Sequence, residues 1–374
     1  MKSANGAQQD REIMRRVSAL LRANPDLAPE YNSMRERARN LRVAGSYDIT
    51  SRCNLWCEGC YYFAGDQHAL RDEADLERWR AFFESERDRG VTFAYIGGAE
   101  PALEQKRIRL AQENIPYGTV AANGTIKINP DIHYRIIVSV WGDEQLTTEL
   151  RGGSTFWKAI RNYRDDDRAL FAYTITKQNI DQVSKVVEIL AGEGVEVAFN
   201  MFSPTTAYLE KLRTAAENDR EFFRVSNPEN NLCFTDDDLK RCRDTVDQLI
   251  AQYPNNVIYP RAFNREVTAS APLYDLDPET GIATNCAGRH SELRTYLSTL
   301  ELSDRKCCMP NMDCSQCRAL TAYLPSRLKP RPGDVADRQS FIDWIEICQF
   351  WTWFYLGREY RPTVQQVAAA AAAA

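Results

Sequence analysis

Apolar and polar positions alternate along several short segments between residues 45 and 205, and stretches with helical spacing separate these segments. The alternation predicts six strands, over residues 46–50, 91–97, 117–123, 134–141, 169–176 and 195–202. The stretches with helical spacing cover residues 76–89, 103–113, 156–163 and 180–191. Strands that alternate with helices predict an α/β fold with a parallel sheet and right-handed crossovers. The order alone does not distinguish an open doubly wound sheet from a partial barrel.

The pattern changes on both sides of this core. Apolar residues at helical spacing near the amino end predict one or two helices that cover the later domain. A strongly aromatic stretch over 338–358 predicts a helix whose rings pack in a core or against a partner. The expected organisation is a helical segment (1–44), a core (45–205), a helical connection (206–270), a cysteine-rich domain (271–330), an aromatic helical segment (331–367) and an alanine run treated as an artefact (368–374).

Composition and charge narrow the class of protein. Apolar residues make up 44% of the 374 positions and charged residues 26%, which is typical of a globular chain. The net charge of −5 disfavours a nucleic-acid binder that works by neutralising phosphates. No apolar run has the length of a membrane span, and the first residues lack the apolar stretch of a secretory signal. We therefore expect a cytoplasmic protein with no membrane or nucleic-acid partner.

Cysteine is the unusual residue, with eleven copies beside three histidines. Three cysteines stand directly after the first predicted strand, at Cys53, Cys57 and Cys60, in a C-x3-C-x2-C spacing. Three thiolates in one loop can hold an iron–sulfur cluster and leave its fourth iron open. The alternatives are a zinc site, for which His68 is the nearest fourth ligand, and cysteines that bind no metal.

The segment CNLWCEGC resembles the cluster loop of the radical S-adenosylmethionine (SAM) superfamily. The resemblance extends through most of residues 45–205 and implies a partial (β/α)6 TIM barrel with its site at the carboxyl ends of the strands. It implies that Cys53, Cys57 and Cys60 hold a [4Fe–4S] cluster whose open iron binds SAM. Gly59 stands where many members carry an aromatic residue, so stacking on adenine is expected from Tyr61 or Tyr62.

Further segments extend the resemblance toward SAM. Gly98-Ala99-Glu100-Pro101 is similar to the family's GGEP segment, with alanine in place of its second glycine. Glycine lets the backbone approach a ligand, and Glu100 offers an acceptor for an ammonium group. Glu149-Leu150-Arg151-Gly152 resembles a segment whose arginine reaches the SAM carboxylate or ribose. The residues implied to bind SAM are Gly98, Ala99, Glu100, Pro101, Asn123, Ser139, Arg151, Asn200, Met201 and Tyr62.

A second group of cysteines follows the core. The candidate ligands are Cys286, Cys307, Cys308, Cys314 and Cys317. The resemblance implies an auxiliary [4Fe–4S] cluster in a SPASM or twitch domain. Structural zinc, which fits the same spacing, and cysteines that bind no metal are the alternatives. Because Cys307 and Cys308 are adjacent, we expect only one of them to bind metal. The isolated Cys233, Cys242 and Cys348 are expected to be small core residues.

The resemblance implies an enzyme that cleaves SAM reductively and abstracts a hydrogen atom from a substrate. A flavodoxin or ferredoxin would supply the electron. The expected substrate is a small molecule of natural-product biosynthesis or a peptide, and a maturase of ribosomally made peptides is the alternative. No residue is assigned to catalysis. A protein of another class, a non-catalytic binding module stabilised by zinc, remains the rival interpretation.

Overall fold

The computed structural model describes residues 4–41, 43–63, 66–214, 223–290, 293–304, 307 and 312–357. Its centre is a parallel sheet, and the six predicted strands are present with ends that differ from the prediction by at most two residues. The strands are β1 (Ala44–Asp48), β2 (Phe93–Gly97), β3 (Tyr117–Ala122), β4 (Arg135–Val140), β5 (Ala169–Ile175), β6 (Val197–Met201) and β7 (Arg294–Tyr296).

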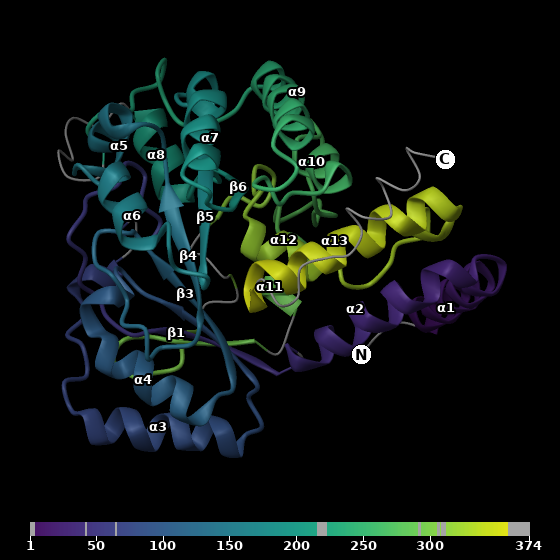
Figure 1. Cartoon of the computed structure of the whole chain (residues 1–374), viewed down its shortest axis with the longest axis horizontal. Coiled ribbons are helices and arrows are strands. Elements are labelled where there is room, and N and C mark those ends of the chain that lie inside the picture. The colour runs from purple at the N-terminus through teal and green to yellow at the C-terminus, as the bar shows by residue number, and fades with distance from the viewer. Residues whose placement is uncertain are drawn as a thin grey trace.

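The strand order is β6-β5-β4-β3-β2-β1-β7, and every neighbouring pair is parallel. The first six strands follow one another in chain order, so every β–α–β crossover steps in the same direction along the sheet. The seventh strand, β7, was not predicted, and it extends the sheet beyond β1. β6 and β7 are the two edges, so the sheet does not close on itself (Figure 1).

Helices connect the strands and form the two ends of the chain (Figure 1). None of the helices in the described part of the chain has the length and apolar character needed to cross a membrane. The α-helices are α1 (Ala4–Ala23), α2 (Ala28–Asn40), α3 (Leu76–Asp88), α4 (Gln105–Asn114), α5 (Glu144–Arg151), α6 (Phe156–Tyr163), α7 (Val183–Gly192), α8 (Thr206–Thr214), α9 (Asp236–Gln252), α10 (Arg261–Val267), α11 (Ala287–His290), α12 (Leu320–Ser326) and α13 (Arg338–Leu356). The short 3-10 helices are η1 (Pro25–Leu27), η2 (Asp66–Ala69), η3 (Pro101–Glu104), η4 (Ile180–Gln182) and η5 (Gly333–Val335).

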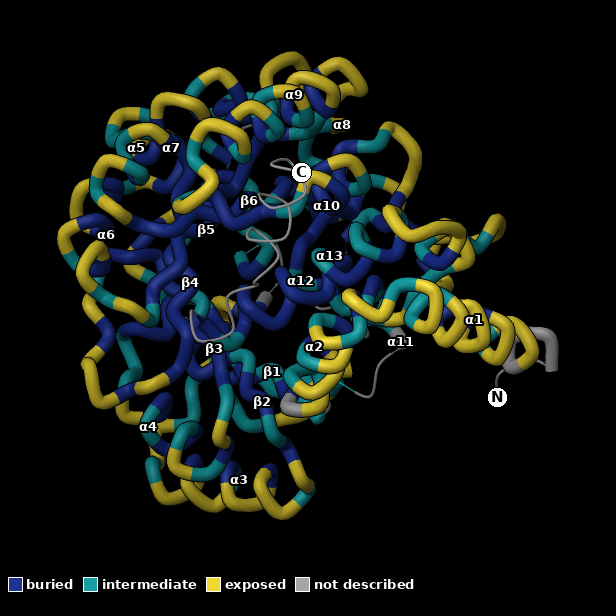
Figure 2. Tube along the Cα trace, turned by 45° about the vertical axis from the view of Figure 1, so that its right-hand side comes forward, coloured by how far each residue is buried: buried dark blue, intermediate teal, exposed yellow. Residues whose placement is uncertain are grey.

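Side-chain alternation along the strands separates two faces of the sheet. The outer face packs under the helices, as Tyr47 does against Phe83 of α3 with ring centroids 5.3 Å apart. Outer residues near the carboxyl ends of the strands, such as Ile96 and Val138, have no exposed surface. Figure 2 shows the buried residues gathered on the strands, with exposed residues on the outward sides of the surrounding helices.

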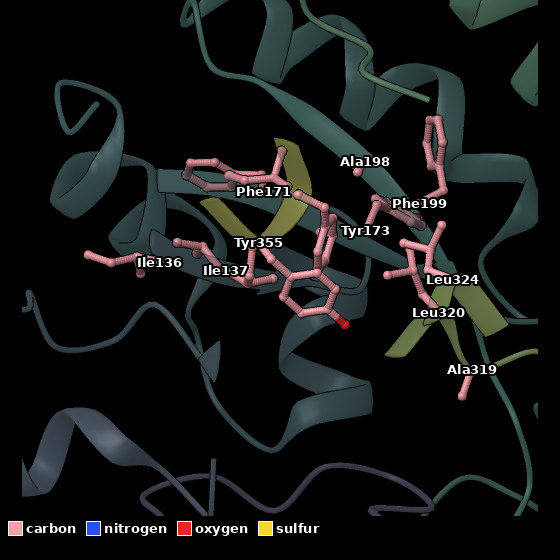
Figure 3. Packing of buried hydrophobic residues seen from close by; sticks show 14 of the residues in the cluster. Ile136, Ile137, Phe171, Tyr173, Ala198, Phe199, Ala319, Leu320, Leu324 and Tyr355 are labelled. Atoms are coloured by element: carbon pink, nitrogen blue, oxygen red, sulfur yellow. The ribbon is translucent and has the colours of Figure 1, made fainter. Parts of the chain in front are cut away.

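Helix α13 enters the inner side of the barrel at the amino ends of the strands. The Thr119 hydroxyl of β3 donates to the Tyr355 carbonyl at 2.8 Å, and the Tyr355 ring lies 5.6 Å from the Phe93 ring. The Arg135 guanidinium at the start of β4 lies over the Trp353 ring at 5.0 Å. Figure 3 shows Tyr355 beside Ile137 of β4 within the same core. The aromatic stretch is therefore core packing, as the sequence predicted.

A second core joins the two ends of the chain. Ile13 and Val17 of α1 and Tyr31 of α2 pack with Phe341 and Trp344 of α13. The Tyr31 and Phe341 ring centroids are 5.8 Å apart. The predicted amino-terminal helices are present, but they pack against α13 and project to one side rather than covering the barrel (Figure 1).

Candidate functional site

The first cysteine loop lies at the carboxyl end of β1, and its three thiols are half-buried. The Cys53 sulfur accepts from the Leu55 N–H at 3.4 Å and from the Asn123 side-chain amide at 3.9 Å. The Cys60 sulfur accepts from the backbone N–H groups of Tyr62 and Phe63. Burial raises the pKa of the Cys53 thiol to about 11 and that of Cys60 to about 12. Both thiols are therefore neutral at pH 7 until a metal displaces their protons.

An arginine supplies positive charge to this loop. The Arg151 Nε donates to the Cys57 sulfur at 3.5 Å, and the Arg151 Nη1 donates to the Ser139 backbone carbonyl at 2.6 Å. Arg151 is buried, and it belongs to α5, a helix that the sequence analysis did not predict. The structure therefore brings Arg151, Ser139 and the cysteine loop together, as the resemblance implied for a SAM site.

The backbone of the cysteine loop is fixed on two sides. The Trp56 and Glu58 N–H groups donate to the carbonyls of Arg151 and Leu150 at 3.0 and 2.7 Å. The fully buried Glu58 carboxylate accepts three backbone N–H groups, from Arg224 at 2.7 Å, Val225 at 3.3 Å and Ser226 at 3.1 Å. The Arg224 side chain returns to the Trp56 carbonyl. Sequence reasoning missed Glu58, although an acidic residue between two metal ligands was a visible signal.

The packing around the loop leaves no room for a side chain at Gly59. Its φ of +58° is in the left-handed region, and a Cβ there would lie 2.9 Å from the Tyr208 ring and 3.3 Å from the Phe202 ring. Tyr208 of α8 is held in place because its hydroxyl meets the Ser226 hydroxyl at 2.6 Å. Glycine at this position therefore leaves room for the Tyr208 ring, which comes from another element.

The segment after β2 folds back onto the cysteine loop. The Ala99 N–H donates to the Thr50 carbonyl at 2.9 Å, and the Glu100 N–H donates to the Arg52 carbonyl at 3.0 Å. Gly98 has a φ of +111°, and a Cβ there would lie 2.6 Å from the Thr50 carbonyl oxygen. Ala99 has no positive φ, so alanine fits where the family carries its second glycine.

Glu100 lies at the centre of this region and is buried. Its carboxylate accepts from the backbone N–H of Ala102 at 3.0 Å and of Asn123 at 2.7 Å. Burial raises the pKa of Glu100 to about 7, and the two N–H donors and Arg151 partly offset that rise. The carboxylate thus fixes η3, where Pro101 is the first residue, to the end of β3.

The remaining residues predicted to bind SAM lie around the same strand ends. The Asn123 side chain donates to the Asn54 side-chain Oδ1 at 2.8 Å, which ties the end of β3 to the cysteine loop. The Asn200 side chain accepts from the Leu320 N–H at 3.2 Å, and Met201 is buried beside it. The buried Tyr62 hydroxyl donates to the Thr50 carbonyl at 3.3 Å. Contact of these residues with SAM stays a prediction.

The second cysteine group gathers at the carboxyl end of β6. The Asp313 N–H donates to the Pro204 carbonyl at 3.3 Å and the Arg318 N–H to the Ser203 hydroxyl at 2.8 Å. These bonds place the turn that carries Cys314 and Cys317 at the end of the sheet where the first loop lies. Cys286, Cys314 and Cys317 are buried and Cys307 is half-buried. Cys308 lies outside the described residues.

The thiol of Cys317 lies near the other described thiols of this group. Burial raises the pKa of Cys317 to about 12, and the neighbouring thiols of Cys307, Cys286 and Cys314 add to the rise. Burial also raises the pKa of Cys286, whose sulfur accepts the backbone N–H groups of Arg289 and Gly288. Of the isolated cysteines, Cys242 and Cys348 are core residues as predicted, and Cys233 is half-buried beside a smaller core.

Both cysteine groups have the chemistry of thiolate metal ligands. Their donors are sulfur atoms, and backbone N–H groups, with an arginine at the first loop, point at those sulfurs. Such hydrogen bonds stabilise the thiolate form and tune iron–sulfur clusters. Among the residues that the structure describes, no three Cys, His, Asp or Glu side chains lie close enough to hold a single metal ion. The first loop fits the cluster that the resemblance implies.

The chain is similar in fold to several solved structures. SuiB of Streptococcus suis bound to S-adenosylmethionine matches with a TM-score of 0.50 and 15% identity, over 72% of this chain and 61% of SuiB. SuiB bound to its precursor peptide SuiA matches with a TM-score of 0.51 and 13% identity, over 86% of this chain and 69% of SuiB. anSMEcpe with bound AdoMet matches with a TM-score of 0.50 and 13% identity, over 82% of this chain and 96% of anSMEcpe.

These matches concern the fold. The chain spans less than two thirds of SuiB in the match to its S-adenosylmethionine-bound structure. No family model matches the chain, and no curated protein matches it. The chain therefore has the fold that SuiB and anSMEcpe share, which confirms the partial barrel implied by the resemblance to the radical SAM superfamily.

Proposed function

We propose that this chain is a radical SAM enzyme. The observation that carries the proposal is the loop of Cys53, Cys57 and Cys60 at the carboxyl end of β1, with N–H donors and Arg151 directed at its sulfurs. These three thiols would hold a [4Fe–4S] cluster, which on reduction would supply the chemistry that cleaves SAM to methionine and a 5′-deoxyadenosyl radical able to abstract a hydrogen atom from the substrate. A flavodoxin or ferredoxin would supply the electron.

The chain's own residues would orient the cofactor and protect it. The turn at Gly98 brings the backbone against the cysteine loop, and Glu100 holds the ends of β2 and β3 together. The Arg151 guanidinium offsets the negative charge of thiolates at Cys57. Half-buried Ser139 and Asn200 present polar groups at the strand ends where SAM would lie.

The second cysteine group supports an auxiliary cluster, with Cys286, Cys307, Cys314 and Cys317 as ligands. The Cys317 thiol lies within electrostatic range of the other three, and the sulfurs of Cys286 and Cys317 accept backbone N–H groups. The group lies at the end of the barrel that carries the first loop, so an auxiliary centre would face the substrate. Zinc on these four thiols is the alternative that metal analysis decides.

We propose a peptide as the first substrate to test. SuiB matches in complex with its precursor peptide SuiA, and anSMEcpe also matches in complex with the Cp18Cys peptide. The matches show the fold alone, and the preference for a peptide over a small molecule depends on these two complexes. We also propose a cytoplasmic enzyme, since oxygen would destroy an exposed cluster.

Anaerobic reconstitution tests the proposal. Iron, sulfide and zinc are counted per chain, and 5′-deoxyadenosine is measured after reduction with SAM present. We expect about four irons for the first loop and about eight with the auxiliary cluster. Cys53→Ala should abolish nucleoside formation, whereas Cys233→Ala, a half-buried cysteine outside both groups, should retain it.

Three results would contradict the proposal. Zinc in both cysteine groups with no iron would favour the non-catalytic binding module. Iron without nucleoside formation would separate cluster binding from SAM cleavage. Nucleoside formation by Cys53→Ala would show that another residue holds the cluster. A double variant, Cys314→Ala with Cys317→Ala, should lower the iron count by about half if the auxiliary cluster exists.

A further inference from the structure

Arg318 is buried directly beside the second cysteine group. It follows Cys317 in the chain, and only 6% of its surface is exposed. Its backbone N–H donates to the hydroxyl of Ser203, two residues after β6, at 2.8 Å. Its guanidinium Nη1 donates to the backbone carbonyl of Val267, the last residue of α10, at 2.8 Å. These bonds hold the side chain in the interior, between β6 and α10.

The positive charge of Arg318 has no partner of opposite charge in the described part of the chain. The bond to the Val267 carbonyl is the one hydrogen bond that its guanidinium makes to a described residue, although a guanidinium has five N–H donors. Burial of an ion without a counter-ion is strongly unfavourable. A buried group of this kind indicates an anion that the polypeptide alone does not supply.

The other buried arginines indicate what that anion is. Of the five buried arginines in the part of the chain that the structure describes, three form an ion pair with a carboxylate, namely Arg107, Arg135 and Arg327. The other two are Arg151 and Arg318. Arg151 donates instead to the sulfur of Cys57 in the first cysteine loop, and Arg318 follows Cys317 of the second group. Each buried arginine without a carboxylate therefore lies at a cysteine group.

A cluster held by thiolates has the charge that Arg318 lacks. Four thiolate ligands outweigh the positive charge of an iron–sulfur core, so the whole centre is an anion, and reduction adds one more negative charge. A fixed positive charge in a low-dielectric interior favours the more negative state of a neighbouring group. Arginine suits this position because it keeps its charge when it is buried.

We propose that Arg318 is the buried counter-cation of the auxiliary [4Fe–4S] cluster and raises the reduction potential of that cluster. The inference rests on the proposed function, because it concerns the cluster assigned there to Cys286, Cys307, Cys314 and Cys317. Arg318 acts through its charge on the cluster and contacts neither SAM nor the substrate. It is therefore a positioning residue rather than a catalytic one.

Redox titration of the full, reconstituted chain tests the assignment. Dithionite supplies one electron per cluster in the presence of mediator dyes, and electron paramagnetic resonance measures the reduced fraction at each potential. The auxiliary signal is the one that the double variant, Cys314→Ala with Cys317→Ala, removes. Arg318→Gln should lower the equilibrium constant for reduction of this cluster about tenfold or more, which lowers its midpoint potential by about 59 mV or more.

Two further variants separate the charge of Arg318 from its packing. Arg318→Lys keeps the positive charge and should keep a midpoint potential closer to that of the parent than to that of Arg318→Gln. Arg265→Gln removes an exposed charge from α10, the helix that carries Val267, and should leave the potential unchanged. If Arg318→Gln folds but does not retain auxiliary iron, the inference requires that Arg318→Lys retain it.

The outcomes separate this inference from the proposed function. An unchanged midpoint potential in Arg318→Gln overturns the inference. Equal shifts, or equal losses of iron or of folding, in the glutamine and lysine variants also overturn it, because the residue would then act through packing alone. Zinc in the second group overturns it too, whereas 5′-deoxyadenosine formed by the unmodified chain would still support the radical SAM function. Absence of iron from both groups would overturn the inference and the proposed function together.

Discussion

Gly98 shows how one missing side chain decides the shape of the site. Its left-handed backbone and its approach to the Thr50 carbonyl join the end of β2 to the cysteine loop. Any side chain there must displace backbone rather than a flexible group. The sequence identified this glycine by its resemblance to a motif, and the structure gives the physical reason for it.

Gly98→Ala should therefore destabilise the protein by about 1–3 kcal/mol, because it adds backbone strain and a collision with a carbonyl oxygen. Chemical denaturation measures the change. Gly192→Ala is the matched control, since Gly192 ends α7 and a Cβ there meets nothing within 4 Å. The control should be neutral or slightly stabilising, and equal losses in both variants would contradict this explanation.

The partly buried carboxyl group of Glu346 in α13 should make the stability of the chain depend on pH. Burial raises its pKa to about 7, the neighbouring Asp343 adds to the rise, and Arg265 partly offsets it. The folded chain thus keeps the proton up to about pH 7, whereas the unfolded chain releases it near pH 4.5. This contribution to stability is complete below pH 4.5 and is lost as the pH rises through 7.

Glu346→Gln should remove that dependence. The free energy of unfolding of the parent should fall by at most about 3 kcal/mol more than that of the variant between pH 4.5 and pH 8. Denaturation curves at several pH values measure the difference. Glu84→Gln, at an exposed position of α3, should leave the pH profile unchanged. Parallel profiles for the parent and Glu346→Gln would refute the assignment.

At the scale of elements, the sequence predicted the six core strands but neither the edge strand β7 nor the short helix α5. The six core strands have alternating or continuous apolar residues of their own, so their positions follow from local pattern. β7 has three residues, and its pairing with β1 comes from the tertiary arrangement rather than from a pattern. Helix α5 has eight residues and was read as a motif, so the burial of Arg151 was not foreseen.

The residues of the candidate site also divide into those that the sequence predicts and those that only the folded structure reveals. The cysteines and the GGAEP segment were predictable because sequence spacing carries them. The roles of Glu58 and Tyr208 were not, because each depends on a residue from another element.

An ion cluster around Arg327 joins α10, α12, η5 and α13. The buried Arg327 guanidinium after α12 donates to Glu266 of α10 at 2.7 and 2.8 Å and to Asp334 of η5 at 2.8 Å. Its carbonyl accepts from the Trp344 indole of α13 at 2.8 Å. Removal of the cation would leave two carboxylates facing each other in a partly buried site.

Arg327→Met should therefore lower the free energy of unfolding by about 3–5 kcal/mol, as expected when one partner of a buried ion pair is removed. Urea denaturation measures the loss. Arg338→Met breaks an exposed pair with Asp26 and should cost less than about 1 kcal/mol. Similar small losses in both variants would show that the cluster contributes little to stability.

At the scale of the whole molecule, α13 connects the barrel to the amino-terminal helices. Its carboxyl-terminal half packs inside the sheet and its amino-terminal half packs against α1 and α2. Trp353 has no exposed surface, and its indole N–H has no hydrogen-bond partner in the described part of the chain. The Trp353 side chain therefore stabilises the fold through the volume it fills and its contact with Arg135, not through hydrogen bonding.

Trp353→Ala should destabilise the chain by about 3–5 kcal/mol, because a large cavity would open in the core. Trp353→Phe keeps most of the ring and removes the unpaired N–H, so its stability should stay within about 1 kcal/mol of the parent. Thermal and chemical denaturation measure both variants. A phenylalanine variant as unstable as the alanine variant would contradict the volume explanation.

The Glu58 carboxylate has a consequence for biosynthesis. Its three amide partners stand 166 to 168 positions further along the polypeptide. While a ribosome is still making the earlier part of the protein, these partners do not yet exist, and the thiol-bearing loop lacks one of its two anchors. If the loop holds the proposed cluster, its full anchoring requires translation through residue 226, so we expect loading with iron and sulfide to be late rather than as the first β–α units emerge.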